Sequence, residues 1–319
     1  MKRTRICNLF GIEYPIVQGG MGWLASAELA AAVSNAGALG MLSPTGGAGP
    51  DQDWVENLRI QIRKTKDLTD KPFGVNIWLE EPRHKELIDT AIEEGVGIVA
   101  TAAGSPALYT KYLKERGIKV MHPVFSVRHA RRGEAEGLDA VIASGVDAGG
   151  LLSRDELTTL VLVPQVVDVV KIPVIAAGGI VEERGTVAAF ALGAEAIQMG
   201  TRFIATHECI AHPNYKQAIL KAIDTDTAIT GRTGLIPARC IKNKLARQIL
   251  EMDSKGVSYE EVMGFIGRGR LRMAALDGNI EEGSILCSSA AGMIKEILPV
   301  KEVIKRIVEG YDRIIAALA

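Results

Sequence analysis

The sequence predicts a (β/α)8 barrel. Eight short apolar runs, rich in Val and Ile, alternate with amphipathic stretches, and the chain has 319 residues, a length that one α/β barrel can reach. Continuous apolar runs are typical of parallel strands that are buried on both faces. A doubly wound open sheet is the alternative, but the count reaches eight and no GxGxxG motif follows the first run.

The elements follow one another in strand–helix order. The predicted strands are 15–20, 38–42, 73–79, 97–102, 119–124, 140–145, 173–179 and 196–201, and the helices between them are 26–35, 53–66, 84–94, 106–115, 127–136, 158–170 and 182–192. This alternation of strands and helices indicates a sheet of parallel strands covered by helices.

After the eighth run the pattern changes. Residues 208–282 contain helical patterns at 215–223, 241–252, 259–265 and 271–276, and the last stretch carries Ile304, Ile307, Val308 and Tyr311 on one helix face. We therefore expect residues 1–207 and 283–319 to form the barrel, with 208–282 as a helical insertion that acts as a lid over its mouth.

Composition excludes several classes of protein. Lys and Arg number 37 against 38 Asp and Glu, so the net charge of −1 argues against a nucleic-acid partner. No apolar run reaches the roughly 18 residues of a membrane span. The four cysteines are scattered without a CxxC pair and no HExxH motif occurs, so we expect no metal site and a reducing, cytoplasmic location.

Two glycine groups end the last two predicted strands. Ala177-Gly178-Gly179-Ile180 ends the seventh and Gly200-Thr201-Arg202 ends the eighth. The loops after these strands form the common phosphate site of barrel enzymes, because glycines let backbone N–H groups approach phosphate oxygens. The alternative is that these glycines only permit tight turns. Because both groups fall at the expected strands, we favour a phosphate site.

Three further features belong to the same end of the barrel. Gln18-Gly19-Gly20-Met21 ends the first strand, and Asp147-Ala148-Gly149-Gly150 follows the sixth. Asn76 lies within the third strand, where a buried amide needs a hydrogen-bond partner. That partner is either a ligand or the backbone of a neighbouring loop.

These motifs occur together in one order. They are Gln18-Gly19-Gly20-Met21, Lys71-Pro72-Phe73-Gly74-Val75-Asn76, Asp147-Ala148-Gly149-Gly150, Ala176-Ala177-Gly178-Gly179-Ile180, Met199-Gly200-Thr201-Arg202-Phe203 and Ala211-His212-Pro213-Asn214-Tyr215-Lys216. The ordered set resembles the nitronate monooxygenase (2-nitropropane dioxygenase) family, which also contains flavin-dependent enoyl-ACP reductases and NADH:quinone reductases. The resemblance covers nearly the whole chain and does not discriminate among the three activities.

The resemblance implies a barrel that binds FMN non-covalently. It makes Gln18, Gly19, Gly20 and Met21 cofactor-binding residues, with Gly20 and Met21 against the flavin, and it assigns Asn76 a hydrogen bond to the ring. It puts Gly149 and Gly150 beside the ribityl chain. It assigns the phosphate to Gly178 and Gly179, which follow Ala177, and to Gly200 and Thr201. The flavin would carry the redox chemistry, and the protein would position it and tune its electronics.

One position departs from the family pattern. Members usually carry a histidine directly after the Gly149-Gly150 pair, whereas this chain has Leu151. Leu cannot move a proton, and both nitroalkane deprotonation and enoyl reduction benefit from such a group. His122, at the end of the fifth strand, is a hypothetical replacement acid or base. Its alternative is a histidine with a purely structural role.

The leading interpretation is therefore an FMN-dependent oxidoreductase. NAD(P)H would reduce FMN, and the electrons would pass to a small unsaturated acceptor or to oxygen. Nitronate oxidation and enoyl-thioester reduction are the enzymatic alternatives, and a flavin-binding electron-relay module is the non-enzymatic one. A homodimer stays open, as does an acyl-carrier protein recognised by basic residues at 128–132 or 239–247.

Overall fold

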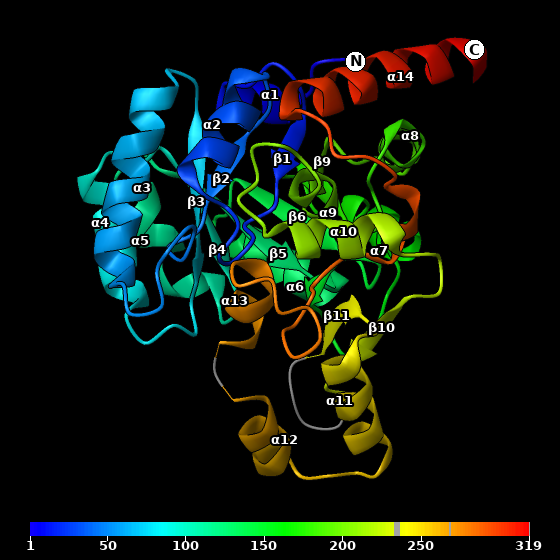
Figure 1. Cartoon of the computed structure of the whole chain (residues 1–319). Helices are drawn as coiled ribbons and strands as arrows, with labels where there is room; N and C mark the ends of the chain where they lie inside the picture. The colour runs from blue at the N-terminus through cyan, green and yellow to red at the C-terminus, as the bar shows by residue number, and fades with distance from the viewer. Residues whose placement is uncertain (233–236, 268, 319) are drawn as a thin grey trace.

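Eight parallel strands form the body of the protein (Figure 1). The computed structural model describes residues 1–232, 237–267 and 269–318. The strands are β1 (Ile16–Gln18), β2 (Gly40–Leu42), β3 (Phe73–Trp78), β4 (Ile98–Ala102), β5 (Lys119–Val124), β6 (Ala140–Ser144), β8 (Val174–Ala177) and β9 (Ala196–Met199). Their spatial order, β1-β9-β8-β6-β5-β4-β3-β2, is that of a (β/α)8 barrel, and the predicted fold is confirmed.

The barrel closes between β1 and β2. A parallel bridge joins Val17 to Leu39, and the backbone N–H of Gln18 donates to the carbonyl of Leu39 at 2.9 Å. The side-chain amide of Gln18 extends this contact, because Nε2 donates to the Met41 carbonyl at 2.8 Å and Oε1 accepts from the Met41 N–H at 3.3 Å. Gln18 thus replaces ladder hydrogen bonds between the two short edge strands.

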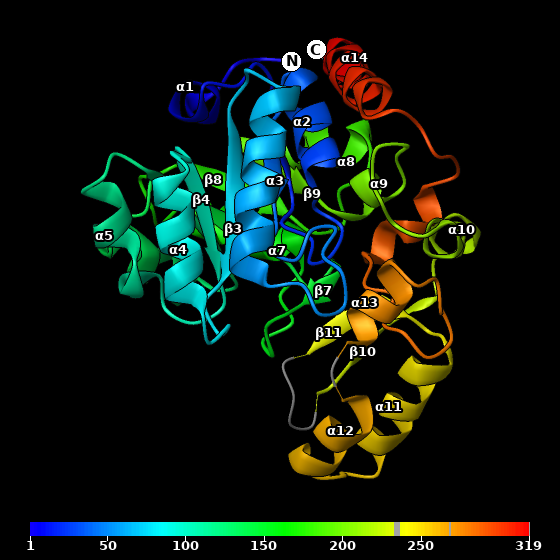
Figure 2. The ribbon, with the colours of Figure 1, turned by 60° about the vertical axis from the view of Figure 1, so that its left-hand side comes forward.

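Helices cover the outside of the strands (Figure 2). They are α2 (Ala27–Asn35), α3 (Trp54–Leu68), α4 (His84–Glu93), η1 (Pro106–Leu108) with α5 (Thr110–Lys114), α6 (Val127–Ala135), α7 (Thr159–Val167) and α8 (Glu183–Ala191). The C-terminal α14 (Val300–Leu318) packs against α8 and α2 and so completes the ring of helices. Side-chain caps begin several of them; Asp53, for example, accepts from the N–H groups of Val55 and Glu56.

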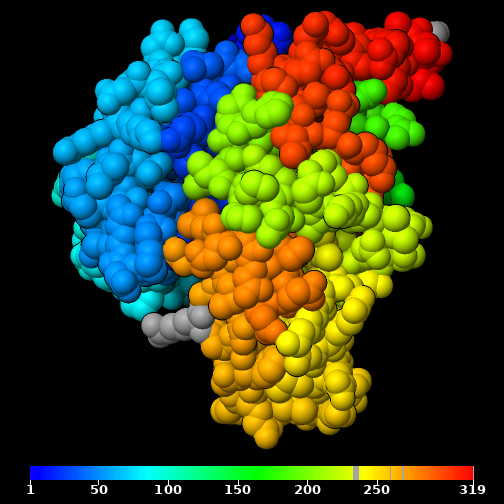
Figure 3. Space-filling model, viewed as in Figure 1, coloured from blue at the N-terminus to red at the C-terminus, as the bar shows by residue number. Residues whose placement is uncertain are grey.

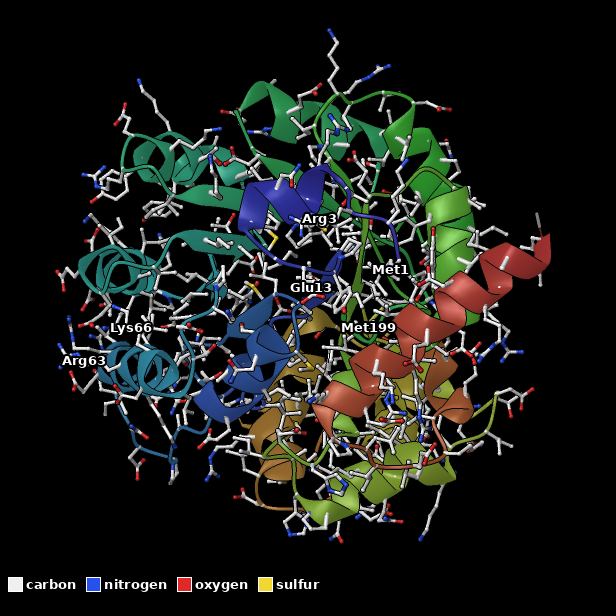
Figure 4. All side chains as sticks on the ribbon, turned by 90° about the horizontal axis from the view of Figure 1, so that it is seen from above. Met1, Arg3, Glu13, Arg63, Lys66 and Met199 are labelled. Carbon is white, nitrogen blue, oxygen red and sulfur yellow. The ribbon has the colours of Figure 1, made fainter. Side chains whose placement is uncertain are left out.

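The strands have two buried faces, which explains their continuous apolar runs. On β3, Val75 and Ile77 pack in the core between strands and helices, so Gly74 and Asn76 face the barrel interior. The interior core includes Met41, Met121 and Ile142, together with Ile6 and Phe10 of α1 (Arg5–Phe10). The view from above in Figure 4 shows that α1 lies across the amino-terminal end of the barrel. The opposite, carboxyl-terminal end therefore carries the mouth.

The inserted segment is helical in part. It contains α10 (Pro213–Lys221), α11 (Lys244–Ser254), α12 (Tyr259–Ile266) and α13 (Arg270–Ala275), of which α11 and α12 form a lobe that projects from the barrel (Figure 3). It also contains the strands β10 (Thr227–Thr230) and β11 (Ala238–Ile241), which the sequence analysis did not predict. These four-residue strands pair antiparallel with each other, and β11 also pairs antiparallel with β7 (Gly150–Leu151). Both are too short and polar to give an apolar run.

Candidate active site

Gly20 and Asn76 meet at the carboxyl-terminal end of the barrel. A β-carbon on Gly20 would lie 2.3 Å from both Cβ and Cγ of Asn76, so only glycine fits at this position. Met21 continues from Gly20, and its sulfur would lie 3.6 Å from a β-carbon on Gly200. The structure therefore brings together the predicted residues of the first, third and eighth strands.

Three polar side chains face the barrel axis at this end. Asn76 on β3, Ser144 on β6 and Gln198 on β9 are partly buried, and each alternates with residues of the outer core. None of the three side chains makes a hydrogen bond to another residue that the structure describes. Partly buried polar groups normally have hydrogen-bond partners. Because these two amides and this hydroxyl have none among the described residues, they are free to bind a polar ligand.

Sequence reasoning found Asn76 but missed Ser144 and Gln198. Ser144 is the last residue of β6 and Gln198 the last but one of β9, and each lies on the same face as a residue of the interior core, Ile142 for Ser144 and Ala196 for Gln198. In each strand the polar residue follows an inner-face residue by two positions, and this alternation is the sequence signal that could have indicated it.

The loop after β8 needs its glycines for conformation. Gly178 and Gly179 have φ values of +106° and +71°, and a β-carbon on Gly178 would lie 2.8 Å from Thr159 Oγ1. The Thr159 hydroxyl lies 3.1 Å from the Ala177 carbonyl and 3.0 Å from the Gly178 carbonyl, and it bonds to both. Tight-turn geometry thus accounts for these glycines, and it leaves room for a phosphate contact through their N–H groups.

Thr201 connects this end of the barrel to the C-terminal part of the chain. Its Oγ1 accepts a hydrogen bond from the Ser288 N–H at 2.9 Å, which leaves the hydroxyl hydrogen of Thr201 available for a ligand oxygen. The Ser288 hydroxyl in turn donates to the Asp147 carbonyl at 2.8 Å. The segment before η2 (Ser289–Met293) therefore joins the loops after β6 and β9, which no local sequence pattern indicated.

The loop after β6 is held from one side. A β-carbon on Gly149 would lie 2.4 Å from the Cys287 carbonyl carbon, although Gly149 itself is exposed, so its opposite side is open. Gly150 pairs with Arg239 of β11, and Arg239 donates from Nε to the Val146 carbonyl at 3.0 Å. Leu151, opposite Ala238, is 46% exposed. The insertion thus fixes the backbone at Leu151, the position where the family resemblance leads us to expect a histidine.

His122 lies outside this group of residues. On β5 it has the same orientation as Val120 and Val124, which belong to the core between strands and helices. It is 6% exposed, and its Nδ1 lies 2.8 Å from the Thr101 hydroxyl. Burial lowers the pKa of His122 to about 4, and nearby His129 adds to the effect. This placement argues against the hypothesis that His122 is a replacement acid or base.

Gln18 also differs from its predicted role. Its side chain is fully buried, and its amide is engaged by Met41, so the structure gives it a part in barrel closure instead of cofactor contact. Within the described ranges, no group of three or more His, Cys, Asp or Glu residues is placed to hold a metal ion. No helix of the described residues is long and apolar enough for a membrane span.

The fold and this mouth define a (β/α)8-barrel enzyme with its site at the carboxyl ends of the strands. The sequence matches the nitronate monooxygenase family over residues 3–310, and the chain belongs to that family. It is therefore a flavin-dependent oxidoreductase.

Individual relatives agree with this assignment. A probable nitronate monooxygenase of Staphylococcus saprophyticus is 37% identical over 80% of this chain and 83% of its own length. A (3aS,4S,5R,7aS)-5-hydroxy-7a-methyl-1-oxo-octahydro-1H-indene-4-carboxyl-CoA dehydrogenase of Mycobacterium tuberculosis is 32% identical over 96% of this chain and 95% of its own length.

Solved structures extend the comparison. FabK from Thermotoga maritima superposes with a TM-score of 0.93 at 45% identity, covering 100% of this chain and 99% of FabK. Nitroalkane oxidase from Streptomyces ansochromogenes superposes with a TM-score of 0.85 at 27% identity, covering 98% and 99%.

Proposed function

We propose that the protein uses FMN to pass electrons from NAD(P)H to a small unsaturated acceptor or to oxygen. The observation that carries this proposal is a set of three polar side chains, Asn76, Ser144 and Gln198, on the inner face at the mouth of a barrel of this family. None of them bonds to another residue that the structure describes. The polar edge of a flavin ring offers the donors and acceptors that such side chains need.

The residues present fit FMN at both of its ends. Asn76, Ser144 and Gln198 would bond the polar edge of the ring, and Gly20 leaves a flat approach beside Asn76. The Thr201 hydroxyl, with the N–H groups of the glycine loops, would hold the phosphate without a lysine, which suits the neutral net charge. FMN, when bound, supplies the hydride and electron chemistry.

Leu151 limits the chemistry that the protein itself contributes. Its exposed side chain at the rim of the loop offers no proton. The fold would still bind and orient the reactants, but a proton needed by the product must come from solvent. This favours acceptors that are reduced by hydride without an enzymatic acid.

Enoyl-thioester reduction is the second candidate. FabK, at 45% identity, is a flavin-dependent enoyl-ACP reductase, and one relative is named for a carboxyl-CoA substrate. An acyl-carrier protein partner stays a prediction. Arg239 of the basic stretch already bonds to Val146 and Thr227 and is half-buried, so it offers little to such a partner. The homodimer and the cytoplasmic location also stay predictions.

A redox titration separates these candidates. We would reduce the FMN-loaded protein anaerobically with NADH or NADPH and then add quinone, enoyl-thioester and nitronate acceptors in turn. Bleaching of the flavin by a nicotinamide, followed by reoxidation with an acceptor, supports the proposal. A flavin that neither nicotinamide reduces would identify a relay module instead.

A further inference from the structure

A cavity lies outside the barrel mouth. It has a volume of about 470 Å³ and lies between the start of α8, α9 (Thr201–Ile204), the segment 293–298 and the middle of α14. In Figure 1, α8 and α14 lie side by side above α9. Gly178, Gly179, Gly200 and Thr201 do not line it, so it is separate from the proposed phosphate site. Its size is that of a small-molecule pocket.

Arg202 forms part of the cavity wall and is a buried cation. It is 7% exposed, and its Nη2 donates to the backbone carbonyls of Ala205 and Glu296. Its Nε is buried and has no hydrogen-bond partner among the residues that the structure describes. Burial lowers the pKa of Arg202 to about 10, so the group is still charged at neutral pH. No carboxylate of the described residues forms an ion pair with it.

Three of the four acidic residues that line the cavity already have cationic partners. Glu183 pairs with Arg313 at 3.3 Å, and Glu296 pairs with Arg306 at 2.6 Å. Glu182 pairs with Arg184. The lining groups left without an ion pair among the described residues are Arg202 and Lys295 on the cationic side and Glu309 on the anionic side.

A buried cation without a counter-charge is costly in free energy. An oxyanion would supply that charge and would accept hydrogen bonds from the guanidinium in the planar geometry that carboxylates and phosphates match. We propose that this cavity binds a small molecule through a phosphate or carboxylate group, held by Arg202 and Lys295, at a site separate from that of FMN. The inference stands on this cavity and does not depend on the proposed function.

The test uses FMN-saturated protein, so that the proposed phosphate site of the cofactor is filled. Calorimetric titration in low-salt buffer would measure binding of inorganic phosphate in one arm and of acetate in the other. We expect saturable binding of one equivalent, and the tighter-binding anion assigns the phosphate or the carboxylate class. Absence of binding by both anions would overturn the proposal.

Variants locate the site. Lys295→Glu should weaken anion binding at least tenfold, whereas Lys301→Glu, an exposed charge reversal on α14 outside the cavity, should leave it unchanged. Arg202→Met should abolish binding, and Lys295→Glu keeps the test decisive if Arg202→Met fails to fold. Equal affinity in the Lys295 and Lys301 variants would refute the site. If the protein does not bind FMN, the titration is repeated with Thr201→Val protein. This variant lacks the hydroxyl of the proposed phosphate site, so anion binding then reports on the cavity alone.

Discussion

Gly20 and Asn76 are so close that no side chain larger than hydrogen fits between them, because a β-carbon on Gly20 would lie 2.3 Å from Asn76 Cβ and Cγ. Gly20→Ala should therefore displace the Asn76 amide and weaken FMN binding about tenfold or more, at a cost of about 1–3 kcal/mol in stability from overpacking. Fluorescence titration with FMN measures the effect. The matched control is Gly97→Ala, which meets no atom within 4 Å. Equal FMN affinity in both variants would exclude this role of Asn76.

Ser144 and Gln198 should tune the cofactor without holding the fold together. Because their side chains have no partner among the described residues, Ser144→Ala and Gln198→Leu should change the free energy of unfolding by less than about 1 kcal/mol. Both should shift the flavin absorption maximum and the reduction potential. The matched comparison is Gln18→Leu, which should lower stability through the lost contacts to Met41 while the spectrum stays unchanged. If Gln18→Leu changed the flavin spectrum and Gln198→Leu lowered stability instead, Gln18 would be the cofactor contact and Gln198 the structural residue.

Thr201 should contribute to both stability and phosphate binding. Thr201→Val leaves the buried Ser288 N–H without its acceptor, at a cost of about 1–3 kcal/mol. It also removes the hydroxyl donor, so FMN affinity should fall while affinity for riboflavin, which lacks the phosphate, falls less. Thr201→Ser should restore both properties. An equal loss for FMN and riboflavin would show that the hydroxyl does not bind the phosphate.

His122 should affect the pH dependence of stability and not that of catalysis. Its folded-state pKa of about 4 lies below the ordinary value of 6.5, so the unfolded chain binds the proton first. Stability is fully present above about pH 6.5 and is lost as the pH falls towards 4, by about 3 kcal/mol in all. His122→Gln should flatten this slope in denaturant unfolding measured from pH 4 to 7. A changed pH profile of kcat in that variant would restore the catalytic hypothesis.

Leu151→His should introduce the proton donor that this chain lacks. The position is exposed and its backbone is fixed by β11, so the substitution should cost little stability. General acid catalysis typically contributes about 10²–10⁴-fold, so kcat/KM for an enoyl thioester should rise by at least tenfold. Flavin reduction by NAD(P)H should be unchanged, because hydride transfer needs no acid. An unchanged rate with the thioester would indicate that Leu151 does not face the acceptor.

The barrel itself could be predicted from the sequence because its strands are buried on both faces. That burial produces the continuous Val- and Ile-rich runs from which all eight strands were placed within two residues of their ends. The hairpin β10–β11 could not be predicted in this way, since its strands are short and carry Arg239 and two threonines.

The candidate site could be predicted only where the signal was local. Glycine pairs and Asn76 stand out against apolar strands, so the sequence alone indicates them as candidates. Gln18 is a candidate in the sequence because a buried amide that closes a barrel and one that faces a ligand look alike there; in the structure its amide bonds to the Met41 backbone. The contact of Ser288 with Thr201 spans 87 residues and depends on how the C-terminal segment packs, which no spacing reveals.

The most direct test of the central claim is an equilibrium titration of the purified protein with FMN, followed by anaerobic addition of NADH or NADPH. The account predicts one FMN per chain, a yellow complex and bleaching of its absorption by one of the two nicotinamides. A colourless protein that cannot be reconstituted with FMN would contradict it.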